Sequence, residues 1–363
     1  MTLAVSLRHN LGAFTLQVNF ESSGRVTALF GPSGSGKTSI INAIAGLTRP
    51  QHGYVVVDGR VLVDTAKRVF VPRHRRRIGY VFQDARLFPH MTVRQNLGYG
   101  RFFAPRAERY ADEAMVIDLL GIGQLLDRRP DKLSGGEKQR VAIGRALVAS
   151  PGLILMDEPL ASLDEARKAE ILPYIERLRD EVRVPIVYVS HSVAEVARLA
   201  TEVVLLAAGR VAACGPTAEI MQRLDLLFDD EIGEGGALLE MLVDRHDEAF
   251  GMTVLISAAG EIRVPRIQAL PGVPVRLRIR ARDVMIATHR PEGLSALNVL
   301  AGRIVGMVTE GGPVVDIRVD CNGQTILARL TRQSTHTLGL SLGQEVYAVV
   351  KTVSFDRTNM AKA

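Results

Sequence analysis

The sequence predicts an α/β domain built around a phosphate-binding loop, followed by an all-β region. The first observation is that residues 25–46 join an apolar run to a glycine-rich turn and then to a helical pattern. The second is that later apolar runs, such as residues 153–156, end in polar side chains, as buried parallel strands do at the ligand-binding edge of an open sheet. The third is that the pattern changes to a period of two beyond residue 237, which is typical of β-strands.

The length and composition are those of an ordinary globular chain. Its 363 residues suggest about two domains, and 47% hydrophobic with 23% charged residues can bury a full core. Apolar runs such as residues 203–208 are far shorter than the roughly 18 residues that cross a bilayer. No signal-peptide pattern is present, so we expect a cytosolic chain. Cys214 and Cys321 form no metal-spaced cluster, which argues against structural zinc.

The net charge of +6 is too small to identify a partner. The densest basic run, residues 73–77, has no interleaved aromatic platform on which nucleic-acid bases would stack. We therefore interpret this run as a solvated loop before a strand, and we expect no nucleic-acid partner.

Residues 31–38 fit the pattern G-x-x-x-x-G-K-[ST], in the strand, turn and helix context that this motif requires. The glycines allow consecutive backbone N–H groups to point inward, and the helix N-terminus adds a positive dipole end, so the loop suits phosphate. Lys37 would reach the β- and γ-phosphates, and Thr38 would bind magnesium. The alternative is a plain Gly/Ser linker between a strand and a helix. The predicted phosphate-binding residues are Gly31, Pro32, Ser33, Gly34, Ser35, Gly36, Lys37 and Thr38.

The segments on either side of this loop have strand patterns. Residues 3–20 alternate in the manner of edge strands. Within them, Phe14 precedes the phosphate loop and would stack on an adenine ring, although packing in the core is an equally good interpretation. Residues 54–57 and 61–63 are short strands with an Asp-Gly hairpin turn between them, which indicates a small antiparallel flap.

Residues 107–126 have helical periodicity, and a second helical pattern follows the sequence Leu-Ser-Gly-Gly-Glu. Ser134 and Glu137 have the spacing of a capping box at the start of that second helix. Gly135 and Gly136 leave backbone N–H groups uncovered there, which favours a second anion-binding site. The alternative is an ordinary capped helix.

Three apolar runs end in side chains that are able to do chemistry. Asp157 and Glu158 follow one such run. Two carboxylates at the end of a buried strand cost free energy unless they meet a cation or a reacting group. Asp157 would bind magnesium, and Glu158 would act on an attacking water molecule. His191 follows another such run, and a structural role explains it about as well as a functional one. Gln83 follows a third, and a lone glutamine there is usually just a surface residue. A charged helix is expected over residues 165–183.

The order of these motifs over residues 1–230 resembles the nucleotide-binding subunits of ATP-binding-cassette (ABC) transporters. The sequence LSGGEKQR at residues 133–140 is the most specific part of this resemblance, because phosphate loops occur in many unrelated nucleotide hydrolases. The resemblance implies a P-loop cassette with an antiparallel β flap and a helical subdomain, with ATP and Mg²⁺ as ligands. It also implies a head-to-tail homodimer, in which each ATP lies between the phosphate loop of one copy and the LSGGE segment of the other.

The resemblance also implies roles for individual residues. Glu158 would be the general base, His191 would hold the γ-phosphate, and Gln83 would contact magnesium and signal to the membrane subunit. Asp164 would lie at the dimer seam, and Ser39 would join the phosphate-binding positions. The implied catalytic residues are Glu158, His191 and Gln83, and the implied metal ligands are Thr38, Gln83 and Asp157. The residues implied to contact the partner copy's ATP are Ser134, Gly135, Gly136 and Glu137.

A closer resemblance is to the ATP-binding subunits of bacterial molybdate importers, through residues 79–90, 133–147 and 156–164. This resemblance implies an ATP hydrolase that powers molybdate import from the cytoplasmic face of the inner membrane. The implied partners are an integral membrane permease and, indirectly, a periplasmic molybdate-binding protein.

Three alternatives stay open at this point. Importers of sulfate, iron or sugar have similar cassettes and similar tail barrels. A non-transport mechanical ATPase is disfavoured because the sequence has no second phosphate loop and no heptad run. A sensor module with vestigial hydrolysis is disfavoured by the presence of Glu158 and His191.

The all-β region is expected to follow a boundary at residues 232–236, which divides the chain into domains at residues 1–232 and 237–363. Arginines at every second position from Arg276 to Arg282 indicate one polar strand face, and Gly-Gly and Asn-Gly pairs predict hairpins. We expect a small β-barrel of the oligonucleotide-binding (OB) type. The aromatic side chains that would stack on bases are nearly absent from it.

Residues 293–357 resemble the small molybdate-binding (Mop/TOBE) domain that is appended to molybdate importer ATPases. That domain usually has arginine where Leu297 stands, so an apolar side chain replaces a fork of charged donors. Ser295, Asn298 and Lys351 are the other candidates for oxyanion binding. A structural or dimerising role for this domain is an alternative of at least equal weight.

Overall fold

The computed structural model describes residues 2–12, 14–104, 109–182, 184–221, 236–309, 312–352, 355 and 360–362. The chain divides into two compact units, Met1–Thr217 and Ala218–Ala363, and each is described by itself. The boundary expected at residues 232–236 falls almost wholly outside the described residues.

The first unit alternates strands and helices. Its strands are β1 (Leu3–Leu11), β2 (Phe14–Ser22), β3 (Val26–Phe30), β4 (His52–Val57), β5 (Arg60–Asp64), β6 (Val69–Phe70), β7 (Ile78–Val81), β8 (Leu153–Asp157), β9 (Ile186–Ser190), β10 (Glu202–Ala207) and β11 (Arg210–Pro216). Its helices are α1 (Lys37–Ala45), α2 (Val93–Phe103), α3 (Glu113–Leu119), α4 (Gly135–Val148), α5 (Glu165–Glu181) and α6 (Val193–Leu199). Helix α7 (Thr217–Met221) begins at the division between the units.

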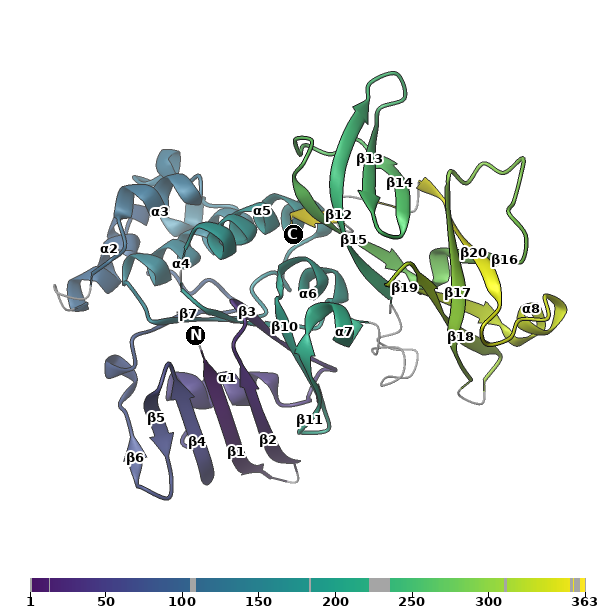
Figure 1. Cartoon of the computed structure of the whole chain (residues 1–363). Helices are drawn as coiled ribbons and strands as arrows, with labels where there is room; N and C mark the ends of the chain where they lie inside the picture. The colour runs from purple at the N-terminus through teal and green to yellow at the C-terminus, as the bar shows by residue number, and fades with distance from the viewer. Residues whose placement is uncertain are drawn as a thin grey trace. The chain divides into compact units, whose positions relative to one another are not determined.

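One sheet organises the first unit, with the order β6-β5-β4-β1-β2-β11-β10-β3-β9-β8-β7 (Figure 1). Strands β10, β3, β9, β8 and β7 are parallel, whereas β1, β2, β4, β5 and β6 pair antiparallel. The edge position expected for residues 3–20 is wrong, because β1 lies between β2 and β4, and β2 lies between β1 and β11. Alternating apolar and polar residues indicate that one face of a strand is covered and the other is exposed. This pattern does not depend on whether the strand lies at the edge or inside the sheet.

Strand β8 shows why the apolar runs of the parallel strands are uninterrupted. Ile154 and Met156 pack in a core with helices α2 to α5, whereas Leu153 and Leu155 pack in a second core with α1 and the antiparallel strands. Successive side chains point to opposite faces of a sheet, so a strand covered on both faces has no position for a polar side chain until it ends.

The antiparallel flap is confirmed. Strands β4 and β5 form a hairpin, and the turn residues Asp58 and Gly59 have φ values of 49° and 73°. Positive φ at both central positions is what a tight two-residue hairpin turn requires, and Asp-Gly is one of the few pairs that adopt it readily.

The predicted helices form with adjusted ends. The periodicity over residues 107–126 corresponds to the shorter helix α3, because the Asp112 side chain caps its start by accepting from the backbone N–H of Ala114 and because Gly121 turns the chain with φ of 57°. Residues 107 and 108 lie outside the described residues. Helix α5 follows the expectation closely, although Pro173 lies inside it.

Arg76 corrects the interpretation of the basic run as a wholly solvated loop. Its side chain is 3% exposed and donates hydrogen bonds of 2.8 Å to the carbonyl oxygens of Ala43 and Ile44, at the C-terminus of α1. A third hydrogen bond, of 2.7 Å, goes to the carbonyl oxygen of Val71. The bonds to Ala43 and Ile44 reach carbonyl groups of the last helical turn, where the helix supplies fewer N–H partners. The neighbours Arg73, His74 and Arg75 are exposed, as expected.

The second unit confirms the all-β prediction. Its strands are β12 (Gly236–Asp247), β13 (Met252–Ser257), β14 (Gly260–Pro265), β15 (Pro274–Arg280), β16 (Val284–Ala287), β17 (Asn298–Val308), β18 (Val314–Cys321), β19 (Gln324–Thr331), β20 (Glu345–Val350) and β21 (Met360–Lys362), and helix α8 (Arg332–Thr337) follows β19. They form two five-stranded sheets, β14-β13-β12-β15-β21 and β16-β20-β17-β18-β19, which share one hydrophobic core.

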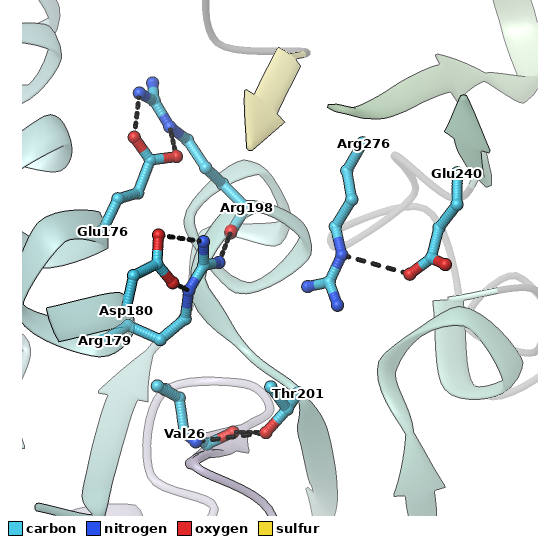
Figure 2. Close-up of polar contacts among 8 residues, drawn as sticks. All are labelled: Val26, Glu176, Arg179, Asp180, Arg198, Thr201, Glu240 and Arg276. Atoms are coloured by element: carbon cyan, nitrogen blue, oxygen red, sulfur yellow. Dashed lines mark hydrogen bonds and ion pairs between the residues drawn. The ribbon is translucent and has the colours of Figure 1, made fainter. Parts of the chain in front are cut away.

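Two features of the expected strand pattern are visible in this unit. The Asn322-Gly323 turn joins β18 to β19, with φ of 54° and 87°. Strand β15 pairs with β12, and Arg276 Nε lies 3.5 Å from Glu240 Oε1 across that pair (Figure 2). Arg282 lies in a short 3-10 turn after the strand rather than on its face.

Candidate functional site

Three parallel strands of the first unit end at the same edge of the sheet. In the registers of these strands, Phe30 at the end of β3 pairs with Ser190 at the end of β9, and Val189 pairs with Asp157 at the end of β8. The neighbouring strand β7 reaches the same level, since Val81 pairs with Met156. The chain segments that follow these strands therefore meet at one edge, and they contain the phosphate loop and the polar residues singled out above.

The phosphate loop has a backbone that only glycine permits at two positions. A Cβ atom on Gly31 would lie 2.2 Å from the carbonyl oxygen of Leu206, and one on Gly36, where φ is 101°, would lie 2.6 Å from Leu16 Cδ1. Helix α1 begins directly after Gly36, and no side chain caps its N-terminus. The N–H groups of its first turn are thus available to an anion.

Lys37 lies across the mouth of this loop. Its Nζ donates hydrogen bonds of 2.8 Å to the carbonyl oxygens of Gly31 and Pro32, and the residue is only 5% exposed. Burial lowers the pKa of Lys37, and the carboxylates of Glu158 and Asp157 oppose that shift. The Oγ of Ser35 is buried and has no hydrogen-bond partner among the described residues, which leaves a donor free for an oxygen of a phosphate.

Thr38 and Asp157 bring two hard oxygen atoms together beside the loop. Thr38 Oγ1 donates to Asp157 Oδ1 across 3.3 Å. Burial raises the pKa of Asp157, while hydrogen bonds from Tyr80 and Thr38 oppose the rise. Magnesium is commonly held by one or two protein oxygens together with substrate phosphates and water, so this pair fits that ion.

Glu158 and His191 face each other at the ends of β8 and β9. His191 Nδ1 lies 3.4 Å from Glu158 Oε2. The backbone N–H of Glu158 donates to the carbonyl oxygen of Val189, and its φ of 45° turns the chain away from the strand direction. The pair is adjacent to Asp157, so a carboxylate and an imidazole lie beside the proposed phosphate and metal positions.

A buried carboxylate, Glu195, accepts hydrogen bonds from the end of the strand that precedes His191. Glu195 on α6 is 5% exposed and accepts hydrogen bonds from Tyr188 Oη (2.9 Å) and Ser190 Oγ (2.8 Å). Lys168 Nζ on α5 lies 3.8 Å from its other oxygen. The sequence did not reveal this residue, because an acidic side chain in the first turn of a helix is already explained by the helix dipole.

Helix α6 is also fastened to α5 (Figure 2). Arg198 forms a two-pronged ion pair with Glu176, with distances of 2.7 and 2.9 Å, and Arg179 donates to the carbonyl oxygen of Arg198 across 3.1 Å. The helix after Asp164 and the helix after His191 are thus held together.

Not every predicted residue is bonded to the other residues of the site. Within the described residues, the exposed side chain of Gln83 makes no hydrogen bond, and no hydrogen bond or ion pair joins Ser134 or Glu137 to the phosphate loop. Ser134 caps α4, and Glu137 completes the capping box. Asp164 caps α5 by accepting from the N–H of Arg167.

Phe14 lies beside the phosphate loop. Its ring is half-buried and packs against the core of α1 and the antiparallel strands. A Cβ atom on Gly36 would lie 3.5 Å from the ring, so one side of Phe14 contacts the loop. Both interpretations of Phe14, a core residue and an adenine platform, are compatible with this position.

Side chains of helix α4 donate hydrogen bonds to backbone carbonyl oxygens of the segment around Gln83. Gln139 Nε2 donates to the carbonyl oxygen of Phe82 across 3.2 Å. Arg145 donates to the carbonyl oxygens of Arg86 and Ala85, at 2.8 and 3.1 Å. Sequence patterns do not predict such contacts, because the acceptors are main-chain atoms that any residue carries.

In the second unit, Asn298 has a structural role. Its side chain is 1% exposed, accepts from the N–H of Arg263 and donates to the carbonyl oxygen of the same residue. Its amide is thereby used within the fold. Ser295, Leu297 and Lys351 are exposed.

Within the described ranges, no helix combines the length and the apolar character needed to cross a membrane.

Comparisons with known proteins show which families the chain is similar to. One family model, described as ABC transporter, matches residues 15–161, and another, described as TOBE domain, matches residues 294–355. A solved structure of cbiO1 from Clostridium perfringens, part of the ABC transporter complex cbiONQ, has a TM-score of 0.52 at 27% identity, covering 62% of this chain and 95% of that one.

Two relatives match almost the whole chain. A molybdenum import ATP-binding protein named ModC from Mesorhizobium japonicum is 70% identical over 359 residues, which are 99% of this chain and 97% of that protein. A protein of the same name from Rhizobium meliloti is 58% identical over 356 residues, which are 98% of this chain and all of the relative. The resemblance to the ATP-binding subunits of molybdate importers is confirmed. The chain therefore belongs to the ABC transporter ATPases and, among them, to the family of molybdenum import ATP-binding proteins.

Proposed function

We propose that this chain is the ATP-hydrolysing subunit that powers molybdate import across the bacterial inner membrane. The observation that supports this most strongly is the 70% identity, over nearly the full length of both chains, to a molybdenum import ATP-binding protein. The site at the sheet edge supplies the chemistry that such an activity needs, a phosphate cradle beside a carboxylate and an imidazole.

The proposed roles are those that the resemblance implies, and the positions of the side chains are compatible with them. Lys37 and the N–H groups of the phosphate loop bind the β- and γ-phosphates of ATP. Glu158 takes a proton from the attacking water, and His191, 3.4 Å from Glu158, holds the γ-phosphate. Thr38 and Asp157 would hold magnesium, with Gln83 as a further ligand. Magnesium bound there would neutralise charge on the phosphate oxygens.

The second wall of the site comes from another copy of the chain. Ser134 and Asp164 are exposed in the first unit and cap their own helices, so their surfaces are available to a partner. We infer that two copies pair head to tail, with residues 134–137 of each facing the phosphate loop of the other. ATP would close this dimer, and hydrolysis with phosphate release would reopen it.

The permease would contact residues 87–99, which follow Gln83 and include the start of α2. We infer that the chain acts at the cytoplasmic face of the inner membrane, with a periplasmic molybdate-binding protein acting through the permease. The cassette would extend over residues 1–232 and the β region over 237–363, with the Mop/TOBE part at about 293–357.

Reconstitution tests the proposal. The chain is assembled with the candidate permease in proteoliposomes, and ATP hydrolysis is measured with binding proteins loaded with molybdate or sulfate. Stimulation by the molybdate-loaded protein is the expected result. Stimulation by the sulfate-loaded protein alone would contradict the assignment of molybdate as the transported ion but not the assignment of ATP hydrolysis. No hydrolysis at all would contradict the ATPase proposal itself.

A further inference from the structure

The phenol of Tyr80 lies between two elements of the nucleotide site. Tyr80 is on β7, three residues before Gln83. Its Oη lies 3.1 Å from Asp157 Oδ2 on β8 and 3.1 Å from the side-chain oxygen of Asn42 on α1. One hydroxyl group thus connects the strand before Gln83, the strand that ends in Asp157 and the helix that begins with Lys37.

The proton of this hydroxyl has one reasonable destination. An ionised carboxylate only accepts hydrogen bonds, so Tyr80 donates to Asp157. The phenol has a single proton, so it is not donated at the same time to the side-chain oxygen of Asn42, which lies 3.1 Å from Oη. The bond to Asp157 is therefore the one that receives the phenol proton, and Asn42 lies beside it.

The two carboxylate oxygens of Asp157 have different partners. Oδ2 of Asp157 accepts from Tyr80, and Oδ1 faces Thr38 Oγ1 at 3.3 Å. The ring of Tyr80 is held in turn by stacking on Phe82, with 4.2 Å between the ring centroids and 23° between the planes. A fixed ring fixes the position of the phenol oxygen, and a hydrogen bond at Oδ2 restricts the directions in which Oδ1 can point.

We propose that Tyr80 is a positioning residue that presents Oδ1 of Asp157 to the magnesium of MgATP. This inference rests on the proposed function, because it assumes that Asp157 and Thr38 hold that ion. Groups that hydrogen-bond to metal-binding carboxylates orient them, and removing such a group typically weakens metal affinity or activity by 10- to 100-fold.

The test is Tyr80→Phe in the full chain, which removes one oxygen atom and keeps the stacked ring. We expect the magnesium concentration for half-maximal ATP hydrolysis to rise by roughly 10-fold, with kcat at saturating magnesium within about 2-fold of the unaltered chain. A second readout does not need hydrolysis. In a Glu158→Gln background with ATP bound, Mn²⁺ affinity measured by electron paramagnetic resonance should fall by a similar factor, while ATP affinity without metal stays the same.

Tyr110→Phe is the matched control. The Tyr110 hydroxyl is also partly buried and donates to the carbonyl oxygen of Pro151 at 2.6 Å, away from the site, so its removal should leave the metal dependence unchanged. An unchanged metal dependence in Tyr80→Phe would overturn the proposal, as would an equal loss of metal-free ATP affinity. If the unaltered chain hydrolyses no ATP, the proposed function fails, and the Mn²⁺ measurement still decides the role of Tyr80.

Discussion

Glu158 is oriented at the site by its backbone and by its neighbour His191. The backbone N–H of Glu158 donates a hydrogen bond to the carbonyl oxygen of Val189, and its φ of 45° turns the chain at the edge of the sheet. There, Oε2 lies 3.4 Å from His191 Nδ1. A positive φ in a residue other than glycine is uncommon and is often found at functional sites, where the surrounding structure enforces it.

Glu158→Gln should bind ATP and turn it over very slowly. The amide keeps the shape of the side chain but does not accept a proton, and a general base contributes roughly 10²- to 10⁴-fold to a rate. ATP affinity is measured by equilibrium binding and hydrolysis by phosphate release. Near-normal hydrolysis in this variant would remove Glu158 from the role of general base.

The capping box of α4 stabilises the start of the helix that we propose faces the ATP of a partner copy. The N–H of Ser134 donates to Glu137 Oε2 at 2.7 Å, and the N–H of Glu137 donates to Ser134 Oγ at 3.2 Å. The first of these bonds is the main reason that the pKa of Glu137 is lowered. The stability that Glu137 contributes is therefore present above its unfolded pKa, near 4.5, and is lost as pH falls through the lower folded value.

Ser134→Ala should cost about 1 kcal/mol of unfolding free energy, because it removes the cap. Urea denaturation at pH 7 measures this loss. Glu137→Gln should remove the acid-dependent part, so the stability difference from the unaltered chain should shrink between about pH 5 and pH 3. A difference that stays constant over this range would show that the charge of Glu137 does not stabilise the helix.

Helix α4 also determines the position of the segment around Gln83. Arg145 donates to the carbonyl oxygens of Arg86 and Ala85, and its guanidinium lies 5.3 Å from the ring centroid of Phe88. Movement of α4 would therefore move this segment with it.

Arg145→Lys should loosen the segment, because an ammonium group cannot reproduce the fork of two hydrogen bonds. Hydrogen exchange of the amides in residues 83–88 should accelerate by about 10-fold, as expected for about 1.4 kcal/mol of lost local stability. Arg140→Lys is the matched control, since Arg140 on the same helix donates to the carbonyl oxygens of Leu120 and Gly121 instead. Equal acceleration in both variants would mean that α4 is destabilised as a whole.

At the scale of the whole molecule, the sequence predicted the parts of the site but not the contacts between them. The phosphate loop, the capping box and the carboxylates at the strand end are local patterns, and each of them formed where it was expected. The order β3-β9-β8-β7 is not the chain order, so the approach of Tyr80 to Asp157 or of Glu195 to Ser190 depends on strand pairing and register. Those are decided by packing across the two cores, which a single-sequence pattern does not contain.

The proposed dimer predicts that two inactive variants restore activity when they are mixed. Lys37→Ala damages the phosphate loop, and Ser134→Arg damages the wall offered to a partner copy, so each alone should hydrolyse little ATP. In a mixed dimer, the intact phosphate loop of the Ser134→Arg copy faces the intact residue 134 of the Lys37→Ala copy, and hydrolysis should recover in part. Lys37→Ala mixed with Glu158→Gln is the control. Both of those defects lie on the same copy's side of the site, so no intact site forms and no recovery is expected. Full activity of Ser134→Arg alone would instead mean that one chain completes its own site.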